Sequence, residues 1–250
     1  IYTGTVTASQ ISVGARNILN KSCDLDWPVT STPSIITGFS PNGGDGDNET
    51  LVYDLPLGGK GVVWHGFGTG NDADGGWNTS YINLNQDKTH MFVVYMKKIG
   101  GTDGINNFGP LGSSPELQNL DGTDNSNPYF WYGDLPALNT WYCLIGYVHP
   151  NSYSGPSIGG LYEIGSGRKL VNFTDYKFPS SQTGTSHRAY LYYNSSSGHE
   201  TYFWGPAIYE VDGFQPSIAQ LCDVSDRVGS WTHSSDTTKI DGGDIYTNSI

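Results

Sequence analysis

The chain has 250 residues, of which 14% are charged and 13% are aromatic, and its formal net charge is −12. Binding to nucleic acid needs a basic surface, so this charge argues against a nucleic-acid partner, and it also disfavours an anionic membrane. The 34 glycines and 13 prolines indicate many turns and little helix, so the composition predicts an all-β protein. We recognise no signal peptide, and no apolar run approaches the roughly 18 residues of a membrane-spanning helix.

The chain begins and ends in similar segments. Ile1-Tyr2-Thr3 recurs as Ile245-Tyr246-Thr247, and residues 1–13 alternate β-branched with small polar side chains without any charge. Strands this short bury too little apolar surface to fold alone. Identical chains around a three-fold axis can supply the missing partners, so the ends predict a homotrimer. Two ordinary edge strands or frayed tails are the alternative.

The region between the ends, residues 17–224, shows short strand-like segments separated by turn clusters at 41–48, 70–76 and 194–198. His90–Lys97 is almost continuously apolar, as a strand buried on both faces is. Gly205-Pro206 interrupts the last segment and predicts a break or a bulge, and Pro216–Leu221 predicts a single helical turn. Such strands with long loops favour a two-sheet β-sandwich. The strand candidates are residues 61–67, 90–97, 141–149, 187–193 and 202–211.

Three cysteines, Cys23, Cys143 and Cys222, cannot all pair. Cys143 lies in an apolar strand pattern, so we expect it to be a small buried hydrophobic residue. A disulfide framework is therefore not expected, and this fits folding in a reducing cytoplasm.

One glycine-rich loop carries a candidate metal site. Asp45, Asp47 and Asn48 alternate there at a spacing that suits an oxygen-seeking cation such as Ca²⁺, and Asp72 and Asp74 form a second such pair. Asp, Asn and Gly are also what turns are made of, so a purely structural loop is the alternative. The sequence implies no other cofactor.

Aromatic side chains near acidic loops are candidates for glycan contact. Sugars stack their C–H faces on aromatic rings, while nearby carboxylates and amides bind the hydroxyl groups. For any single one of these aromatic residues, a place in the core is the alternative. The candidate glycan-binding residues are Asp72, Asp74, Trp77, Tyr81, Tyr129, Trp131 and Tyr153.

An enzyme is the main alternative to a binding module. A polysaccharide lyase needs a Tyr or His base beside a charge-neutralising side chain, and a candidate set is His149, Tyr153, His187 and Arg188, with Tyr190 beside them. A retaining glycosidase needs two neighbouring carboxylates, but the glutamates are isolated from one another in the sequence. No histidines have metal-pair spacing. Because the sequence shows neither a carboxylate pair nor a metal pair, it favours a non-catalytic module over a lyase or depolymerase.

The end segments resemble recurrent phrases of phage and prophage tail-tip and host-specificity proteins. The first phrase is Ile-Tyr-Thr-Gly-Thr-Val-Thr-Ala-Ser-Gln-Ile-Ser-Val-Gly-Ala-Arg-Asn-Ile-Leu at 1–19, and its companion is Thr238–Thr247. The resemblance implies a stalk segment at 1–16, a sandwich domain at 17–224, and a linker with a returning stalk segment at 225–250. It also implies a homotrimeric virion fibre, made in the bacterial host cytoplasm, that attaches to a host-cell glycan or only spaces the fibre.

Residues 141–221 resemble the laminin-G and concanavalin-like superfamily. There, as here, a Trp-Tyr strand (Trp141-Tyr142) begins a central pair, and a late aromatic strand with a proline leads into a Pro-Ser-Ile turn (Pro216-Ser217-Ile218). The resemblance implies a jelly-roll sandwich. That fold hosts lectins, adhesion modules, glycosidases and lyases alike, so it does not select a function.

Overall fold

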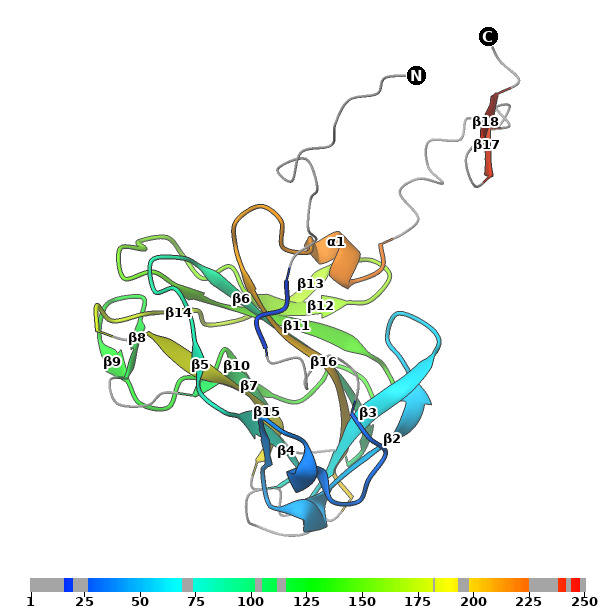
Figure 1. Cartoon of the computed structure of the whole chain (residues 1–250), viewed down its shortest axis with the longest axis horizontal. Helices are drawn as coiled ribbons and strands as arrows, with labels where there is room; N and C mark the ends of the chain where they lie inside the picture. Colours follow the sequence, from blue (N-terminus) through cyan, green and yellow to red (C-terminus); the bar gives the residue numbers. More distant parts are fainter. Residues whose placement is uncertain are drawn as a thin grey trace.

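The computed structural model describes residues 16–19, 27–68, 74–101, 105–111, 116–181, 183–192, 198–224, 238–241 and 244–247. These residues form a β-sandwich of two sheets, which confirms the predicted all-β sandwich class (Figure 1). None of the described helices is long and apolar enough to cross a membrane.

The smaller sheet has six antiparallel strands. Its order is β1 (Phe39–Pro41), β4 (Gly76–Thr79), β15 (Gly184–Tyr192), β7 (Ile105–Leu111) and β10 (Trp131–Gly133), with β5 (Ile82–Asn83) beside β15. Because successive side chains of a strand point to opposite faces, neighbouring residues of β15 have opposite surroundings. His187, Ala189 and Leu191 are buried between the sheets, and Arg188 and Tyr190 lie on the outer face.

The larger sheet has ten strands. Its main order is β2 (Asn48–Asp54), β3 (Lys60–Phe67), β16 (Glu200–Glu210), β6 (His90–Gly100), β11 (Tyr142–His149), β14 (Tyr176–Lys177), β8 (Leu117–Asn119) and β9 (Asp124–Asn125). The first half of β11 also pairs with β12 (Gly160–Glu163), which pairs with β13 (Lys169–Asn172). Only the β11–β14 pair is parallel among the described pairs.

Five short elements complete the described residues. The 3-10 turns η3 (Pro33–Ile35) and η4 (Asp45–Asp47) precede β1 and β2. The single turn α1 (Ile218–Leu221) begins at a reciprocal capping box between Ser217 and Gln220, which satisfies backbone N–H groups that the helix leaves unpaired. The predicted turn at Pro216–Leu221 is thereby confirmed. The strands β17 (Thr238–Asp241) and β18 (Asp244–Thr247) pair as a separate two-stranded sheet.

The core between the sheets is dominated by aromatic rings. Trp27, Phe39, Trp64 and Trp77 form one cluster, with ring centroids 5.4–6.0 Å apart. The larger sheet also carries a second apolar layer on its outer face, around Tyr95 of β6 and Cys143 of β11. β6 is therefore buried on both faces over most of its length, as its apolar run predicts. This outer layer is where the candidate site lies.

Candidate functional site

The strand β16 is interrupted by a bulge at Gly205-Pro206. Its register against β6 shifts between Trp204 and Ala207. Pro206 has no N–H to donate to a ladder, and Gly205 adopts a φ of 60°, a conformation that other residues avoid. The bulge bends the strand away from its neighbour and opens space above Tyr95. The interruption predicted from Gly205-Pro206 is therefore confirmed.

The segment 16–19 supplies hydrogen bonds to the edge of β16 at this bulge. Asn17 Nδ2 donates to the Pro206 carbonyl at 3.1 Å, and Asn17 Oδ1 accepts from the Ile208 N–H at 3.0 Å. The Ile18 N–H donates to the Ile208 carbonyl at 2.7 Å. Strand β3 pairs with β16 only over Glu200–Phe203, so residues 17 and 18 satisfy backbone groups that β3 does not reach.

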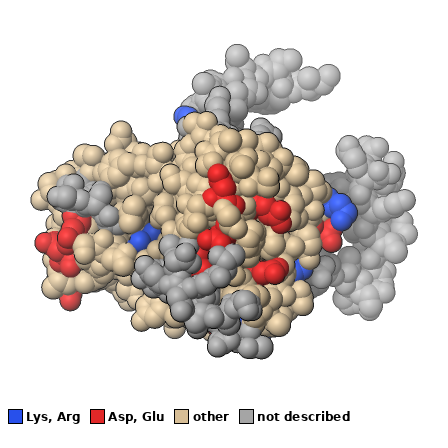
Figure 2. Space-filling view, turned by 90° about the horizontal axis from the view of Figure 1, so that it is seen from below, with Lys and Arg blue, Asp and Glu red and all other residues tan. Residues whose placement is uncertain are grey.

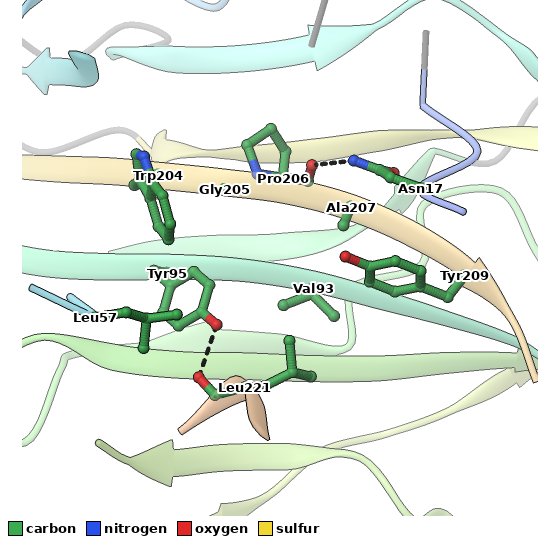
Figure 3. Close-up of a pocket in the computed structure, with 10 residues that line it drawn as sticks. All are labelled: Asn17, Leu57, Val93, Tyr95, Trp204, Gly205, Pro206, Ala207, Tyr209 and Leu221. Carbon is green, nitrogen blue, oxygen red and sulfur yellow. Dashed lines mark hydrogen bonds between the residues drawn. The ribbon is translucent and has the colours of Figure 1, made fainter. Parts of the chain in front are cut away.

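An apolar pocket of about 320 Å³ lies at the bulge (Figure 3). Tyr95 and Trp204 stand at one end and Tyr209 at the other, with Val93 and Ala207 between them (Figure 3). Leu57, in the turn between β2 and β3, and Leu221 of α1 complete the walls. This volume is at the lower end of the range of small-molecule sites.

Few polar groups face this pocket. The Tyr95 hydroxyl donates to the Leu221 carbonyl at 2.7 Å, and burial raises the pKa of Tyr95 well above its usual range. Trp204 is 9% exposed. Among the described lining residues there is no carboxylate, histidine, serine, threonine or cysteine side chain. The arrangement can therefore hold a ligand by stacking against its aromatic rings.

The same face continues from Trp204 into an aromatic and ionic strip. Tyr202 packs on Tyr53, with ring centroids 4.3 Å apart, and Lys97 Nζ lies 3.3 Å from the Tyr53 hydroxyl. His65 lies 4.9 Å from the Tyr202 ring, measured between centroids. Because Tyr202 and Trp204 are two residues apart on one strand, they share this outer face. A chain-like ligand can extend from the pocket along the strip.

His65 stands between two glutamates. Its Nδ1 lies 2.9 Å from Glu49 Oε1, and its Nε2 lies 3.3 Å from Glu200 Oε2. Glu49 and Glu200 are far apart in the sequence and come together because β2 and β16 both pair with β3. The imidazole fills the space between the two carboxylates, where a glycosidase would need its substrate.

The predicted calcium site is not supported by the geometry. Asn48 is 1% exposed, and its amide oxygen already accepts from Trp64 Nε1 at 2.7 Å and from the Gly76 N–H at 2.6 Å. The Asp45 carboxylate accepts from the N–H and the hydroxyl of Ser34, and Asp47 is 5% exposed. Within the described part of the chain, no group of three or more His, Cys, Asp or Glu side chains could hold a metal ion. Asn48 serves to fix the loop to β3 and β4.

The predicted glycan residues do not share one surface. Trp77 and Asp74 are fully buried, so their assignment to glycan contact is wrong: the inward face of β4 carries Trp77 into the aromatic core. Asp72 lies outside the described residues. Tyr81 is 47% exposed beside a smaller cavity of about 190 Å³ lined by Leu19 and Ile82.

The side chains of the remaining three aromatic candidates each contact neighbouring side chains. Tyr129 stacks on the Arg188 guanidinium at 3.8 Å and shares a short hydrogen bond with the Tyr190 hydroxyl. Trp131 stacks on Phe173, with ring centroids 5.8 Å apart. The Tyr153 ring lies 3.7 Å from the His149 ring, and its hydroxyl donates to the Pro156 carbonyl. Glycan contact at Tyr81, Tyr129, Trp131 and Tyr153 stays a prediction.

The lyase set is separated by the fold. His187 is fully buried, and its Nε2 lies 3.0 Å from the Val93 carbonyl while Nδ1 accepts from the Trp77 indole. Burial lowers the pKa of His187 to about 4, so it is neutral near pH 7. Arg188 points to the opposite face of β15, where Asn127 and the Pro128 carbonyl accept its hydrogen bonds. The grouping of His187 with Arg188 is therefore wrong.

His149 has a structural environment. It is 1% exposed, its Nε2 lies 3.4 Å from Asp175 Oδ2, and its Nδ1 lies 3.2 Å from the Thr89 hydroxyl. Asp175 is fully buried and also accepts from the backbone N–H groups of Tyr147, Ile158 and Gly159. The structure does bring the rings of His149 and Tyr153 together. The role of this cluster is structural, because the Asp175 carboxylate accepts hydrogen bonds from the backbone of the loop before β12.

The pocket residues Trp204, Tyr95, Tyr209 and Leu57 were not among the sequence candidates. One signal pointed toward them, because the Gly205-Pro206 interruption lies between Trp204 and Tyr209 in an otherwise regular strand. The contributions of Leu57 and Leu221 come from distant turns, so no local pattern marks them.

No protein-family model and no curated protein sequence matches this chain. An arabinose-bound α-L-arabinofuranosidase aligns with 86% of this chain at 9% identity and a TM-score of 0.41, and this chain spans 30% of its length. The alginate lyase vAL-1 from Chlorella virus aligns with 70% of this chain and 91% of its own length, at 12% identity and a TM-score of 0.38. The botulinum neurotoxin type G receptor binding domain aligns with 84% of this chain and 50% of its own, at 5% identity and a TM-score of 0.39. Likenesses this distant specify neither an activity nor a ligand for this chain.

Proposed function

We propose that the protein is a non-catalytic, glycan-recognising module of a bacteriophage tail fibre, held as a homotrimer by its terminal segments. The observation that carries glycan recognition is the aromatic pocket at the bulge of β16. Tyr95, Trp204 and Tyr209 surround a space of about 320 Å³, which suits one sugar ring. The apolar faces of a sugar pack on such rings.

The charge of the molecule supports a neutral glycan. The net charge is −12, and the face in Figure 2 shows grouped Asp and Glu side chains with few Lys and Arg. An acidic polysaccharide would be repelled by such a surface, and no basic side chain lines the pocket among its described residues. A neutral sugar needs no counter-charge and meets no such repulsion.

The position of the two domain ends supports the fibre context. Asn17 and Leu221 line the same pocket, so the described residues next to both terminal segments lie close together. A domain inserted between two stalk segments needs its entry and exit to be adjacent. The resemblance of residues 1–19 and 238–247 to phage tail phrases supports the same context.

A glycan array with the full chain, followed by calorimetry on each hit, tests recognition. Leu57→Arg places a charged side chain in the pocket wall and is expected to weaken binding at least tenfold. Leu138→Arg is the matched control, because Leu138 is 45% exposed, Leu57 is 38% exposed, and Leu138 does not line the pocket. Equal loss in both variants, or no binding to any neutral glycan, overturns the assignment of the pocket and leaves a spacer role.

Light scattering of the full chain tests the fibre context separately. The expected mass is that of three chains, each of 27.1 kDa. Removal of residues 1–15 together with 225–250 is expected to leave a monomeric sandwich that keeps its glycan affinity. A stable monomer of the full chain contradicts the trimer without touching the glycan assignment.

A further inference from the structure

Two cysteines that are far apart in the sequence lie together on the outer face of the larger sheet. Cys143 is near the start of β11 and is fully buried, directly opposite Tyr95 of β6 and Tyr162 of β12. Cys222 is also fully buried and directly follows α1. Both belong to the apolar layer that packs on this face.

Three hydrogen bonds fix the backbone at Cys222. Tyr95, the register partner of Cys143, donates its hydroxyl to the carbonyl of Leu221 at 2.7 Å. The Gly165 N–H, in the turn between β12 and β13, donates to the Cys222 carbonyl at 2.6 Å. The Cys222 N–H donates to the Ile218 carbonyl at 2.9 Å. The backbone on both sides of the Cys222 thiol is therefore fixed.

Burial raises the pKa of Cys143, whereas the interaction with Cys143 lowers the pKa of Cys222. Cys222 is thus the more readily ionised of the two, and a thiolate is the attacking species in disulfide exchange. Cys143 is then the thiol that completes the exchange.

We propose that Cys143 and Cys222 form an intramolecular disulfide in an oxidising environment, and that this bond links the end of α1 covalently to β11. The oxidant is a small-molecule disulfide. Both thiols are buried, so the reaction begins when α1 opens locally and exposes Cys222. The Cys222 thiolate then attacks the small disulfide and releases one small thiol, and Cys143 attacks the Cys222 sulfur and releases the second. The protein loses two protons and two electrons, and the small disulfide gains them as two thiols. This inference does not depend on glycan binding.

The bond affects both stability and the pocket. It closes a loop of about 80 residues, which restricts the unfolded chain strongly. Leu221, the neighbour of Cys222, forms one wall of the pocket, so the bond holds that wall in place. A protein that folds reduced and then meets oxidising surroundings becomes more stable after the change.

The test compares the full chain before and after incubation with oxidised glutathione. Titration under denaturing conditions is expected to find three free thiols before oxidation and one after it. Peptide mapping without reductant is expected to recover a linked pair that contains Cys143 and Cys222. The melting temperature is expected to rise by roughly 10 °C, and reductant is expected to reverse the rise.

Cysteine variants separate this bond from other pairings. Cys23→Ser is the matched control and is expected to keep the linkage and the rise in melting temperature, whereas Cys143→Ser and Cys222→Ser lose both. Three persistent thiols in the oxidised wild-type chain overturn the proposal. So does a linkage through Cys23, a linkage between two chains, or a linkage that leaves the melting temperature unchanged.

Discussion

The side chain of Asn17 lies against the Pro206 bulge and donates a hydrogen bond to the Pro206 carbonyl at 3.1 Å. Its amide oxygen accepts from the Ile208 N–H, so one side chain bridges the two sides of the interruption in β16. The bulge opens the aromatic pocket, and Asn17 lines it. A residue at the beginning of the sandwich thereby supports a bulge about 190 positions later in the chain.

Replacement of this asparagine tests the bridge. Asn17→Ala leaves the Pro206 carbonyl and the Ile208 N–H without their side-chain partner, so we expect a loss of about 2 kcal/mol in the free energy of unfolding. Urea denaturation followed by fluorescence measures it. Asn85→Ala is the control, because Asn85 makes only an exposed local bond to the Asp87 N–H. An equal loss in both variants would contradict the special role of Asn17.

The buried carboxylate of Asp175 is the acceptor for three backbone N–H groups and faces His149. In Asp175→Asn one acceptor oxygen becomes an NH₂ group that must face these donors. We expect a loss of about 3 kcal/mol in the free energy of unfolding. Asp87→Asn, at an exposed turn, is expected to change it by less than about 0.5 kcal/mol. Chemical denaturation of both variants measures the two free energies of unfolding. A small effect at Asp175 would contradict the proposed anchoring of the loop.

Lys98 and Asp134 form an ion pair of 2.6 Å in which the lysine is 1% exposed. Asp134→Ala leaves a buried ammonium group without its partner and is expected to lower the free energy of unfolding by about 3 kcal/mol. Adding Lys98→Met to that variant is expected to restore most of the loss, because the buried charge is then gone.

The pair Lys60–Asp54 provides the control, since its length is 2.7 Å but both side chains are about 70% exposed. Asp54→Ala is expected to leave the melting temperature unchanged, because solvent screens exposed pairs. If Asp54→Ala and Asp134→Ala destabilised the protein equally, burial of Lys98 would not be the cause.

Two buried histidines predict how stability depends on pH. Burial lowers the pKa of His90 and of His187 to about 4, against about 6.5 in an unfolded chain. Between these values the unfolded chain binds protons that the folded protein does not. Stability is therefore greatest above pH 6.5 and falls as the pH is lowered toward 4.

The variant His90→Leu isolates one of these contributions. Each histidine contributes a slope of about 1.4 kcal/mol per pH unit, so the variant is expected to lose that amount from the wild-type slope. Denaturant titrations between pH 6.5 and 5 measure it, in a range where most carboxylates stay ionised. An unchanged slope would show that His90 is protonated in the folded protein.

Local patterns in the sequence were sufficient for several elements. The apolar run His90–Lys97 predicted a strand buried on both faces, and β6 is such a strand because apolar layers cover both sides of the larger sheet. Gly205-Pro206 predicted the bulge, because proline lacks a ladder donor. By contrast, β7 has two asparagines and a proline in seven residues, and only its pairing with β15 makes it a strand.

The sequence by itself determined the all-β sandwich, the positions of its apolar strands and the place of the bulge, because these depend on residues close together in the chain. The tertiary structure decided which aromatic rings are available. Strand pairing turns Trp77 into the core and Trp204 toward the pocket. It also decided that Glu49 meets Glu200 across His65 and that Cys143 meets Cys222. Such contacts join distant segments, and a single-residue change of register would move each side chain to the opposite face.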